Sequence, residues 1–273
     1  MSTSADFSVA SATALAASPA ASPATSPAAS AQSSMVVLHR ETHGQQRWDA
    51  QSDRYGFARG SVTAAISLSE LAAACTVFPC VMARSAEGGW SLLAITGLQP
   101  GHNLFVNEEG AWEADYLPAT LASWPFRLVR EGGDAGRFLV AVHSPSLNTT
   151  EGDALFDKAG VEMPWLSERL RALVATDAAL ADTSRLIEAL DQAGLLHART
   201  LQAVLADGRD IELNGFMTVD EALLGDLASD QLHALHTSGA LSLAYLHLLS
   251  MRRFRALVAR ASQRQTAAAE FAA

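Results

Sequence analysis

Ionisable and nucleophilic side chains gather in one short stretch near the middle of the chain. His143 and Ser144 are followed within a few residues by Glu151, Asp153 and Asp157. Together they could furnish a base, a nucleophile and an acid. No nucleophile elbow, Walker loop or Rossmann glycine fingerprint frames them, however. The pattern favours a solvated loop. The alternative is that residues 143–157 form an active site of an unfamiliar kind.

A second group contains histidines and carboxylates closer to the C-terminus. His233 and His236 lie three residues apart, which on a helix would let both reach one metal ion. Asp226, Asp230 and His247 are candidates for further ligands. A metal site needs a third or fourth convergent ligand, and spacing alone does not indicate one. We therefore predict no metal site and no cofactor, and expect a capping or partly buried histidine pair.

An aromatic segment punctuated by prolines spans residues 90–126. It holds three of the five tryptophans, and Pro100, Pro118 and Pro125 punctuate the stretch that contains Trp112, Tyr116 and Trp124. Large rigid side chains can line a binding groove because they supply contact area at low entropic cost. Together with Asn103 they form the predicted ligand-binding set. The same aromatic residues could equally fill the core beneath an irregular loop.

Composition limits the partners that the chain can take. Its 273 residues are 49% apolar, enough for a large core, and the formal net charge is −10 with a pI near 5.2. Nucleic acids and anionic membrane surfaces require clustered Lys and Arg, so neither is an expected partner. Five arginines follow a long apolar stretch, where the macrodipole would favour them at a helix C-terminus: Arg252, Arg253, Arg255, Arg260 and Arg264.

The two cysteines and the absence of targeting signals suggest a location. Cys75 and Cys80 lie among apolar residues and match neither a CxxC motif nor a zinc ribbon, so we expect buried free thiols in a reducing compartment. The most apolar stretch, residues 231–251, carries three histidines and is too polar for a transmembrane span. No basic region opens a secretory signal. We expect a soluble, cytoplasmic protein.

Residues 1–34 have low complexity, since 28 of them are Ala, Ser, Pro or Thr. Repeated Ser-Pro steps break any helix, and the apolar bulk is too small to offset the entropy of ordering. We predict a disordered tail. Met35 begins the first patterned segment, so the tail is either a linker or an over-extended gene start.

Residues 35–145 are predicted to be rich in β-strands. Ser67-x-x-Glu70 is a capping-box pattern that should open a short helix through residue 75, after a strand at 61–67. Glycine-containing turns separate the paired runs of two hairpins. These runs are 78–83 with 91–96, and 126–130 with 137–143, and a further strand is expected at 103–106.

Residues 160–265 are predicted to be mostly helical. Leucines recur at spacings near 3.6 from residue 162 to a stop at Gly194. One hairpin follows, with runs 200–205 and 211–216 around an Asp-Gly turn. Helices at 226–236 and 241–258 complete the chain. The predicted fold class is therefore α+β: an N-terminal antiparallel β-sheet with a helical C-terminal half, packed as one domain over residues 35–273.

Several of these segments, in order and spacing, resemble the bacterial SapC family. The resemblance covers roughly residues 37–260. It rests first on Gly-Trp-Ser-Leu-Leu-Ala at 89–94, Gly-Leu-x-Pro-Gly at 97–101, Asn103-Leu-Phe-Val106, Trp112, Tyr116-Leu-Pro118 and Trp124-Pro-Phe126. Later matches include Ala206-Asp-Gly-Arg209 and Leu235-His236-x-Ser238-Gly239-Ala240-Leu241. Cys80 is a departure, because an aliphatic residue is expected there.

What the resemblance implies about function is limited. The family takes its name from a gene region for a bacterial paracrystalline surface layer, and no reaction is attached to it. It implies a non-catalytic binding or accessory protein linked to a surface or receptor system, with an unknown protein or small molecule as its partner. The alternative hypothesis is an enzyme whose active site lies between His143 and Asp157.

Overall fold

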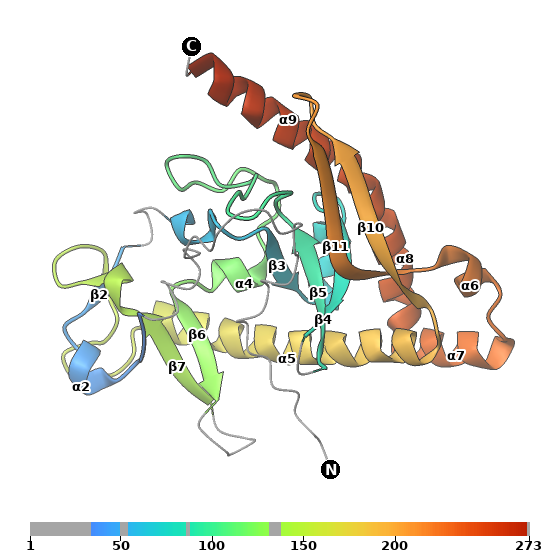
Figure 1. The fold of residues 1–273 in the computed structure, drawn as a ribbon. Coiled ribbons are helices and arrows are strands. Elements are labelled where there is room, and N and C mark those ends of the chain that lie inside the picture. Colours follow the sequence, from blue (N-terminus) through green and yellow to red (C-terminus); the bar gives the residue numbers. More distant parts are fainter. Residues whose placement is uncertain (1–33, 50–53, 86–87, 131–137, 272–273) are drawn as a thin grey trace.

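The computed structural model describes residues 34–49, 54–85, 88–130 and 138–271. The predicted disordered tail lies outside this range except for Ser34. The described residues form antiparallel sheets in the N-terminal half and long helices toward the C-terminus, so the α+β prediction is confirmed (Figure 1). Within these ranges, no helix is both long and apolar enough to cross a membrane.

The largest sheet has five antiparallel strands in the order β10-β11-β4-β5-β3. Its centre is the predicted hairpin of β4 (Cys80–Arg84) and β5 (Trp90–Ile95), whose side chains are mostly buried. β3 (Thr63–Ile66) forms one edge. At the other edge, the long hairpin of β10 (Leu196–Val204) and β11 (Asp210–Val219) joins β4 through a single residue pair. The second half of the chain thus completes a sheet that the first half begins.

Four long helices pack around this sheet. α5 (Pro164–Gln192) runs across much of the molecule in Figure 1, from the side of β6 and β7 to α7 (Ser229–Ser238). α7 and α8 (Ala240–Ser250) come after the β10–β11 hairpin in the chain. α9 (Phe254–Phe271) rises beside the hairpin. The largest core cluster takes buried side chains from these helices and from the sheet, so both halves of the chain share one core.

A buried histidine ties α8 to the sheet. His247 Nε2 accepts a hydrogen bond from Val219 N at 3.2 Å, and Nδ1 bonds Cys80 O at 2.7 Å. One turn later, Ser250 Oγ accepts from Cys80 N at 3.0 Å. The side chains of α8 therefore bond backbone groups of β4 and β11, the two strands that the single residue pair joins.

A second sheet packs against the first part of α5. Its antiparallel strands lie in the order β1 (Met35–Val37), β7 (Phe138–His143), β6 (Phe126–Arg130). The β6–β7 pairing is the second predicted hairpin. A smaller core cluster lies between this sheet and α5, and includes Trp48, Phe126, Val142, Leu166 and Leu173.

Short elements connect the layers. The predicted capping box is present, since Glu70 Oε2 accepts from Ser67 N at 3.0 Å and α3 (Leu68–Ala74) follows. A third, small sheet joins β2 (Arg47–Trp48) to β8 (Leu147–Asn148) and β9 (Asp153–Ala154). The remaining helical turns are α2 (Arg40–His43), η2 (Gly56–Ala58), α4 (Ala119–Ala122), η3 (Ser144–Ser146), α6 (Glu221–Gly225) and η4 (Met251–Arg253).

Two predicted elements differ from the structure. Residues 103–106 form no regular strand, because their backbone groups bond irregular neighbours: Asn103 N donates to Arg59 O at 2.7 Å, and Leu104 N to Thr96 O at 2.8 Å. The helix predicted over 241–258 is divided by the tighter turn η4, and α9 then continues to residue 271. Helical periodicity does not reveal such a change of pitch.

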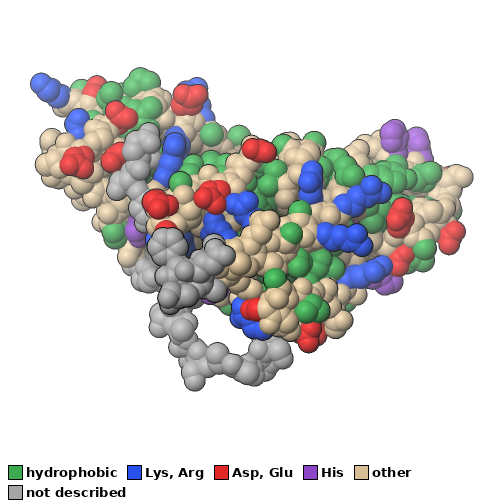
Figure 2. All heavy atoms as spheres, turned by 90° about the horizontal axis from the view of Figure 1, so that it is seen from above, with side chains coloured by type: hydrophobic (Ala, Val, Ile, Leu, Met, Phe, Trp, Pro, Cys, Tyr) green, Lys and Arg blue, Asp and Glu red, His purple; other side chains and the backbone are tan. Residues whose placement is uncertain are grey.

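The five arginines do not share a helix C-terminus, which corrects the sequence interpretation. Arg252 and Arg253 do follow α8, but Arg260 and Arg264 lie inside α9. Both of these donate to Glu113 Oε2, at 3.1 and 2.8 Å, and to carbonyl oxygens of residues 104 and 106. They hold a loop against the helix. On the face shown in Figure 2, Lys and Arg side chains (blue) lie among hydrophobic side chains (green).

Both cysteines are free and buried, as predicted. Cys75 is 3% exposed and Cys80 is fully buried. Burial raises the pKa of the Cys80 thiol to about 12 and also raises the pKa of Cys75. Both residues therefore behave as small core side chains rather than as nucleophiles.

Candidate ligand-binding site

Asn103 follows a tight turn that Pro100 and Gly101 dictate. Proline fixes φ near −65° at the first central position, and glycine accepts the positive φ of the second, here +83°. Across the turn, His102 N donates to Gln99 O at 3.1 Å. The Gln99 and His102 side chains make no hydrogen bond within the described ranges. They are the free polar groups of this loop.

Asn103 itself is only 5% exposed. Its Nδ2 donates to Ala58 O at 3.1 Å, and its Oδ1 accepts from Phe105 N at 2.9 Å. The amide is therefore occupied in anchoring the loop. Asn103 positions its neighbours, because these two bonds use one donor and one acceptor of its amide inside the loop.

Trp112 and Tyr116 belong to one hydrogen-bonded unit. Trp112 Nε1 donates to Tyr116 O at 2.8 Å, and the Tyr116 hydroxyl donates to Glu70 Oε1 at 2.9 Å. Burial and the Glu70 carboxylate raise the pKa of that hydroxyl. The Trp112 ring packs on the rings of Phe78 and Phe105. Both predicted residues are half-buried, and they join the aromatic loop to α3 and the core.

Trp124 lies in a separate aromatic stack. Its ring is stacked on Phe57, with centroids 4.1 Å apart and an interplanar angle of 11°, and its centroid lies 4.6 Å from that of His143. Trp124 is half-buried in the turn just before β6. The structure therefore brings Trp112 and Tyr116 together and places Trp124 elsewhere.

The alternative active-site residues do not assemble into an acid, a base and a nucleophile. His143 Nδ1 lies 2.8 Å from Ser146 Oγ, and burial lowers the pKa of this imidazole. Asp157 Oδ1 accepts from two backbone N–H groups of its own turn, both at 2.8 Å. Glu151 and Asp153 are exposed. In the part of the chain that the structure describes, no hydrogen bond joins these three carboxylates to His143.

The candidate metal ligands are also dispersed. His233 and His236 are exposed on α7, which buries Leu235 instead, so the expected partly buried pair is corrected. His247 is buried, with both ring nitrogens hydrogen-bonded. Over the described ranges, no group of three or more His, Cys, Asp or Glu side chains could hold a metal ion.

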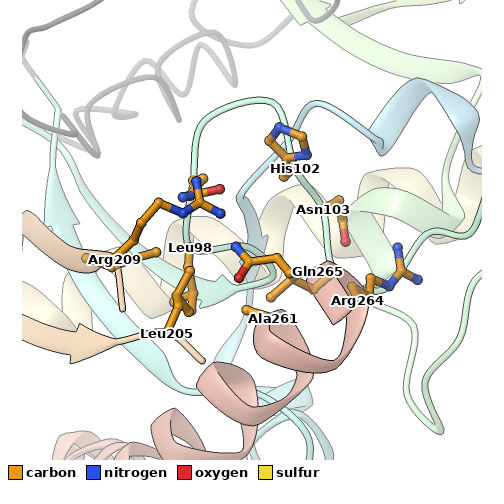
Figure 3. Close-up of a pocket in the computed structure, with 11 residues that line it drawn as sticks. Leu98, His102, Asn103, Leu205, Arg209, Ala261, Arg264 and Gln265 are labelled. Carbon is orange, nitrogen blue, oxygen red and sulfur yellow. The ribbon is translucent and has the colours of Figure 1, made fainter. Parts of the chain in front are cut away.

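A cavity of about 310 Å³ opens beside the turn of Gln99 and His102 (Figure 3). Three segments far apart in sequence form it: the loop 98–104, the turn between β10 and β11, and α9. Its apolar lining consists of Leu98, Leu104, Leu205, Ile211 and Ala261. Its polar lining consists of Gln99, His102, Asn103, Arg209, Arg264 and Gln265. No lining residue is acidic.

Carboxylates outside the lining orient its polar side chains. Arg209 Nε donates to Asp207 Oδ2 at 2.6 Å. The Gln265 amide bridges this pair when its nitrogen donates to Asp207 Oδ2 (3.2 Å) and its oxygen accepts from Arg209 (2.5 Å). Arg264 is held in the same way by Glu113, at 2.8 Å. A ligand in the cavity would therefore meet guanidinium, amide and imidazole groups rather than carboxylates.

The second turn at the cavity is the predicted Asp-Gly turn between β10 and β11. Leu205 N donates to Arg209 O, and Gly208 N donates to Leu205 O, both at 2.9 Å. Gly208 has a φ of +82°, which a side chain would disfavour. Sequence reasoning predicted the Asp-Gly turn but not the glycine turn at residues 99–102, and it missed Arg209 and Gln265 as cavity residues, because no local pattern indicates that the two turns meet.

Comparison with known proteins identifies a family without adding a ligand. The family model described as SapC matches residues 38–257. This range includes both glycine turns of the cavity and ends shortly before Ala261. No curated protein and no solved structure matches the chain.

Proposed function

The chain belongs to the SapC family, and on that premise we propose that it is a non-catalytic binding or accessory protein whose ligand occupies the cavity between the two glycine turns and α9. The observation that carries the proposal is the lining, with apolar side chains on one part, cations and amides on the other, and no carboxylate. The family's association with a bacterial surface layer supports a role in a surface-linked or receptor-linked system.

The lining also indicates the chemistry of the ligand. Apolar walls favour an aliphatic or aromatic body, while Arg209 and the free side chains of Gln99 and His102 favour an anionic or carbonyl-bearing end. Small-molecule sites typically measure about 300–1,000 Å³. At about 310 Å³, this cavity suits a small ligand rather than a polymer.

Three probes of equal chain length test this proposal: octanoate, octanol and octylamine, compared by saturation-transfer NMR on the full chain. We expect octanoate to bind most tightly, octanol weakly and octylamine least, because the polar lining presents guanidinium and amide donors and no carboxylate. Equal binding of all three, or tightest binding of the amine, would contradict the assigned chemistry. Binding of none would contradict the site.

Two pairs of variants locate the binding. Ala261→Leu fills the cavity and should abolish binding of octanoate and octanol, whereas Ala259→Leu, on the exposed side of the same helix, should not. Arg209→Gln should weaken octanoate about tenfold and leave octanol unchanged. Arg185→Gln breaks a comparable exposed ion pair on α5 and serves as its control. If control and test variants bind alike, the ligand lies elsewhere.

A further inference from the structure

The two edges of the five-stranded sheet use their backbone groups differently. At one edge, β3 is four residues long, and the Thr120 hydroxyl of α4 donates to Ala65 O at 2.7 Å. At the other edge, β10 is nine residues long. Within the described ranges its backbone makes hydrogen bonds only in the ladder with β11. An open row of backbone donors and acceptors is a template for another strand.

The irregularity in the β10–β11 hairpin lies on the inner strand. Pairing advances two residues along β10, from Arg199 to Leu201, while it advances three along β11, from Phe216 to Leu213. The extra residue therefore belongs to β11, where Gly215 has a φ of +82°. A bulge in an edge strand protects the edge by bending it. β10 has no such bulge and stays regular.

Side chains of β10 do little to block its edge. Natural edge strands carry Lys, Pro or inward-pointing charges that discourage pairing. The only charged residue of β10 is Arg199, and the strand contains no Lys, Pro or acid. Ala198, Thr200 and Gln202 are all exposed. The edge is accessible to a second strand along most of its length.

The turn fixes which residues direct their backbone outward. Leu205 N donates to Arg209 O, so the backbone of Leu205 faces β11. Because direction alternates along a strand, the backbones of Ala198, Thr200 and Gln202 face away from β11. These three exposed residues are symmetric about Thr200. A strand that runs antiparallel about this point can match them one for one.

We propose that β10 pairs with β10 of a second copy of this chain, antiparallel about a two-fold axis at Thr200. In this register Thr200 lies opposite its own copy and Ala198 lies opposite Gln202 of the second copy, so each outward N–H meets a carbonyl oxygen. Arg199 lies opposite Leu201 of the second copy, and no like charges face each other directly. Because this two-fold pairing uses the β10 edge of each copy, and the Thr120 hydroxyl already bonds Ala65 O at the β3 edge, the assembly closes as a dimer rather than a fibre.

The oligomeric state of the full chain tests the proposal directly. Sedimentation velocity over a concentration series should show a monomer–dimer equilibrium. Thr200→Pro removes an outward N–H from each copy without touching the ladder to β11, and should weaken dimerisation at least about tenfold. Thr200→Val keeps the N–H and is the control. Gln202→Pro repeats the test if Thr200→Pro lowers the melting temperature. A monomer at every concentration, or a dimer insensitive to both prolines, would overturn the proposal.

Cross-linking tests the register independently of the cavity. In Thr200→Cys the two introduced thiols would face each other across the axis, and mild oxidation should yield a disulfide-linked dimer. The native cysteines are buried and do not compete. Thr237→Cys, exposed on α7, should stay monomeric under the same oxidation. Equal cross-linking of both variants, or none at position 200, would refute the register, whatever octanoate binding shows.

Discussion

Acid should destabilise this protein through His247. Val219 N–H can only donate, so Nε2 of His247 must accept, and Nδ1 must carry the proton that it donates to Cys80 O. The buried site therefore requires the neutral imidazole. A second proton, on Nε2, would place an N–H donor of His247 against the N–H donor of Val219. Burial lowers the pKa of His247 from 6.5 to about 4, although the bond to Cys80 opposes the shift.

The sign and size of the effect follow from this pKa. Between about pH 6.5 and 4, an exposed histidine in the unfolded chain binds a proton that His247 in the folded chain does not. The contribution of His247 to the free energy of unfolding should therefore fall as the pH falls through that window, and it should be constant above the window. At about 1.4 kcal/mol per pH unit, the loss amounts to about 3 kcal/mol.

Urea unfolding of the wild type and His247→Gln, followed by tryptophan fluorescence from pH 7.5 to 4, measures this loss. Glutamine keeps one donor and one acceptor but does not titrate, so the variant should lack the histidine-dependent fall. The difference in unfolding free energy between the two proteins should shrink by about 3 kcal/mol across the window. His233→Gln, exposed on α7, should run parallel to the wild type. Parallel curves for His247→Gln as well would refute the assignment.

Three further outcomes follow from burial and hydrogen bonding. Cys75 and Cys80 should resist iodoacetamide in the native protein and react fully in urea, since burial raises both thiol pKa values; rapid native labelling of Cys80 would contradict its placement. Glu70→Gln should lower the free energy of unfolding in urea by about 1–3 kcal/mol. The Glu70 carboxylate accepts four hydrogen bonds, and the NH₂ group of glutamine would instead point at two of these donors. Trp112→Ala should cost about 3 kcal/mol and Trp124→Ala less, since Trp112 packs on the main core; a loss below about 1 kcal/mol for both would favour the groove instead.

Sequence patterns predicted the elements whose causes are local. The α3 helix begins where Ser67 and Glu70 cap it, and α5 ends just before Gly194, whose φ is +72°. Both hairpins with short turns are present because glycine turn chemistry and alternating runs lie next to each other in the chain. Such signals act within a few residues, so one sequence is enough to read them.

Nonlocal features were out of reach for the same reason. The pairing of β11 with β4 joins residues more than a hundred positions apart through a single pair, and the small sheet of β2, β8 and β9 uses strands of two residues. Asn103 was predicted as a ligand-binding residue from its neighbours in the chain, whereas its amide hydrogen-bonds Ala58 O and Phe105 N. The cavity forms where the loop 98–104, the β10–β11 turn and α9 meet, and the spacing of residues within one segment does not predict such a contact.

The β10–β11 hairpin links the main features of this protein. At the end of the hairpin away from its turn, β11 pairs with β4 at one residue pair, and hydrogen bonds from α8 and α9 add to this pairing. His247 fixes that end through Val219, and Ser262 Oγ of α9 accepts from Ala206 N at the turn, at 3.2 Å. The β10–β11 turn lines the cavity, and β10 is the edge strand of the five-stranded sheet. Because a two-stranded ribbon is only marginally stable alone, the packing of these helices must define both surfaces.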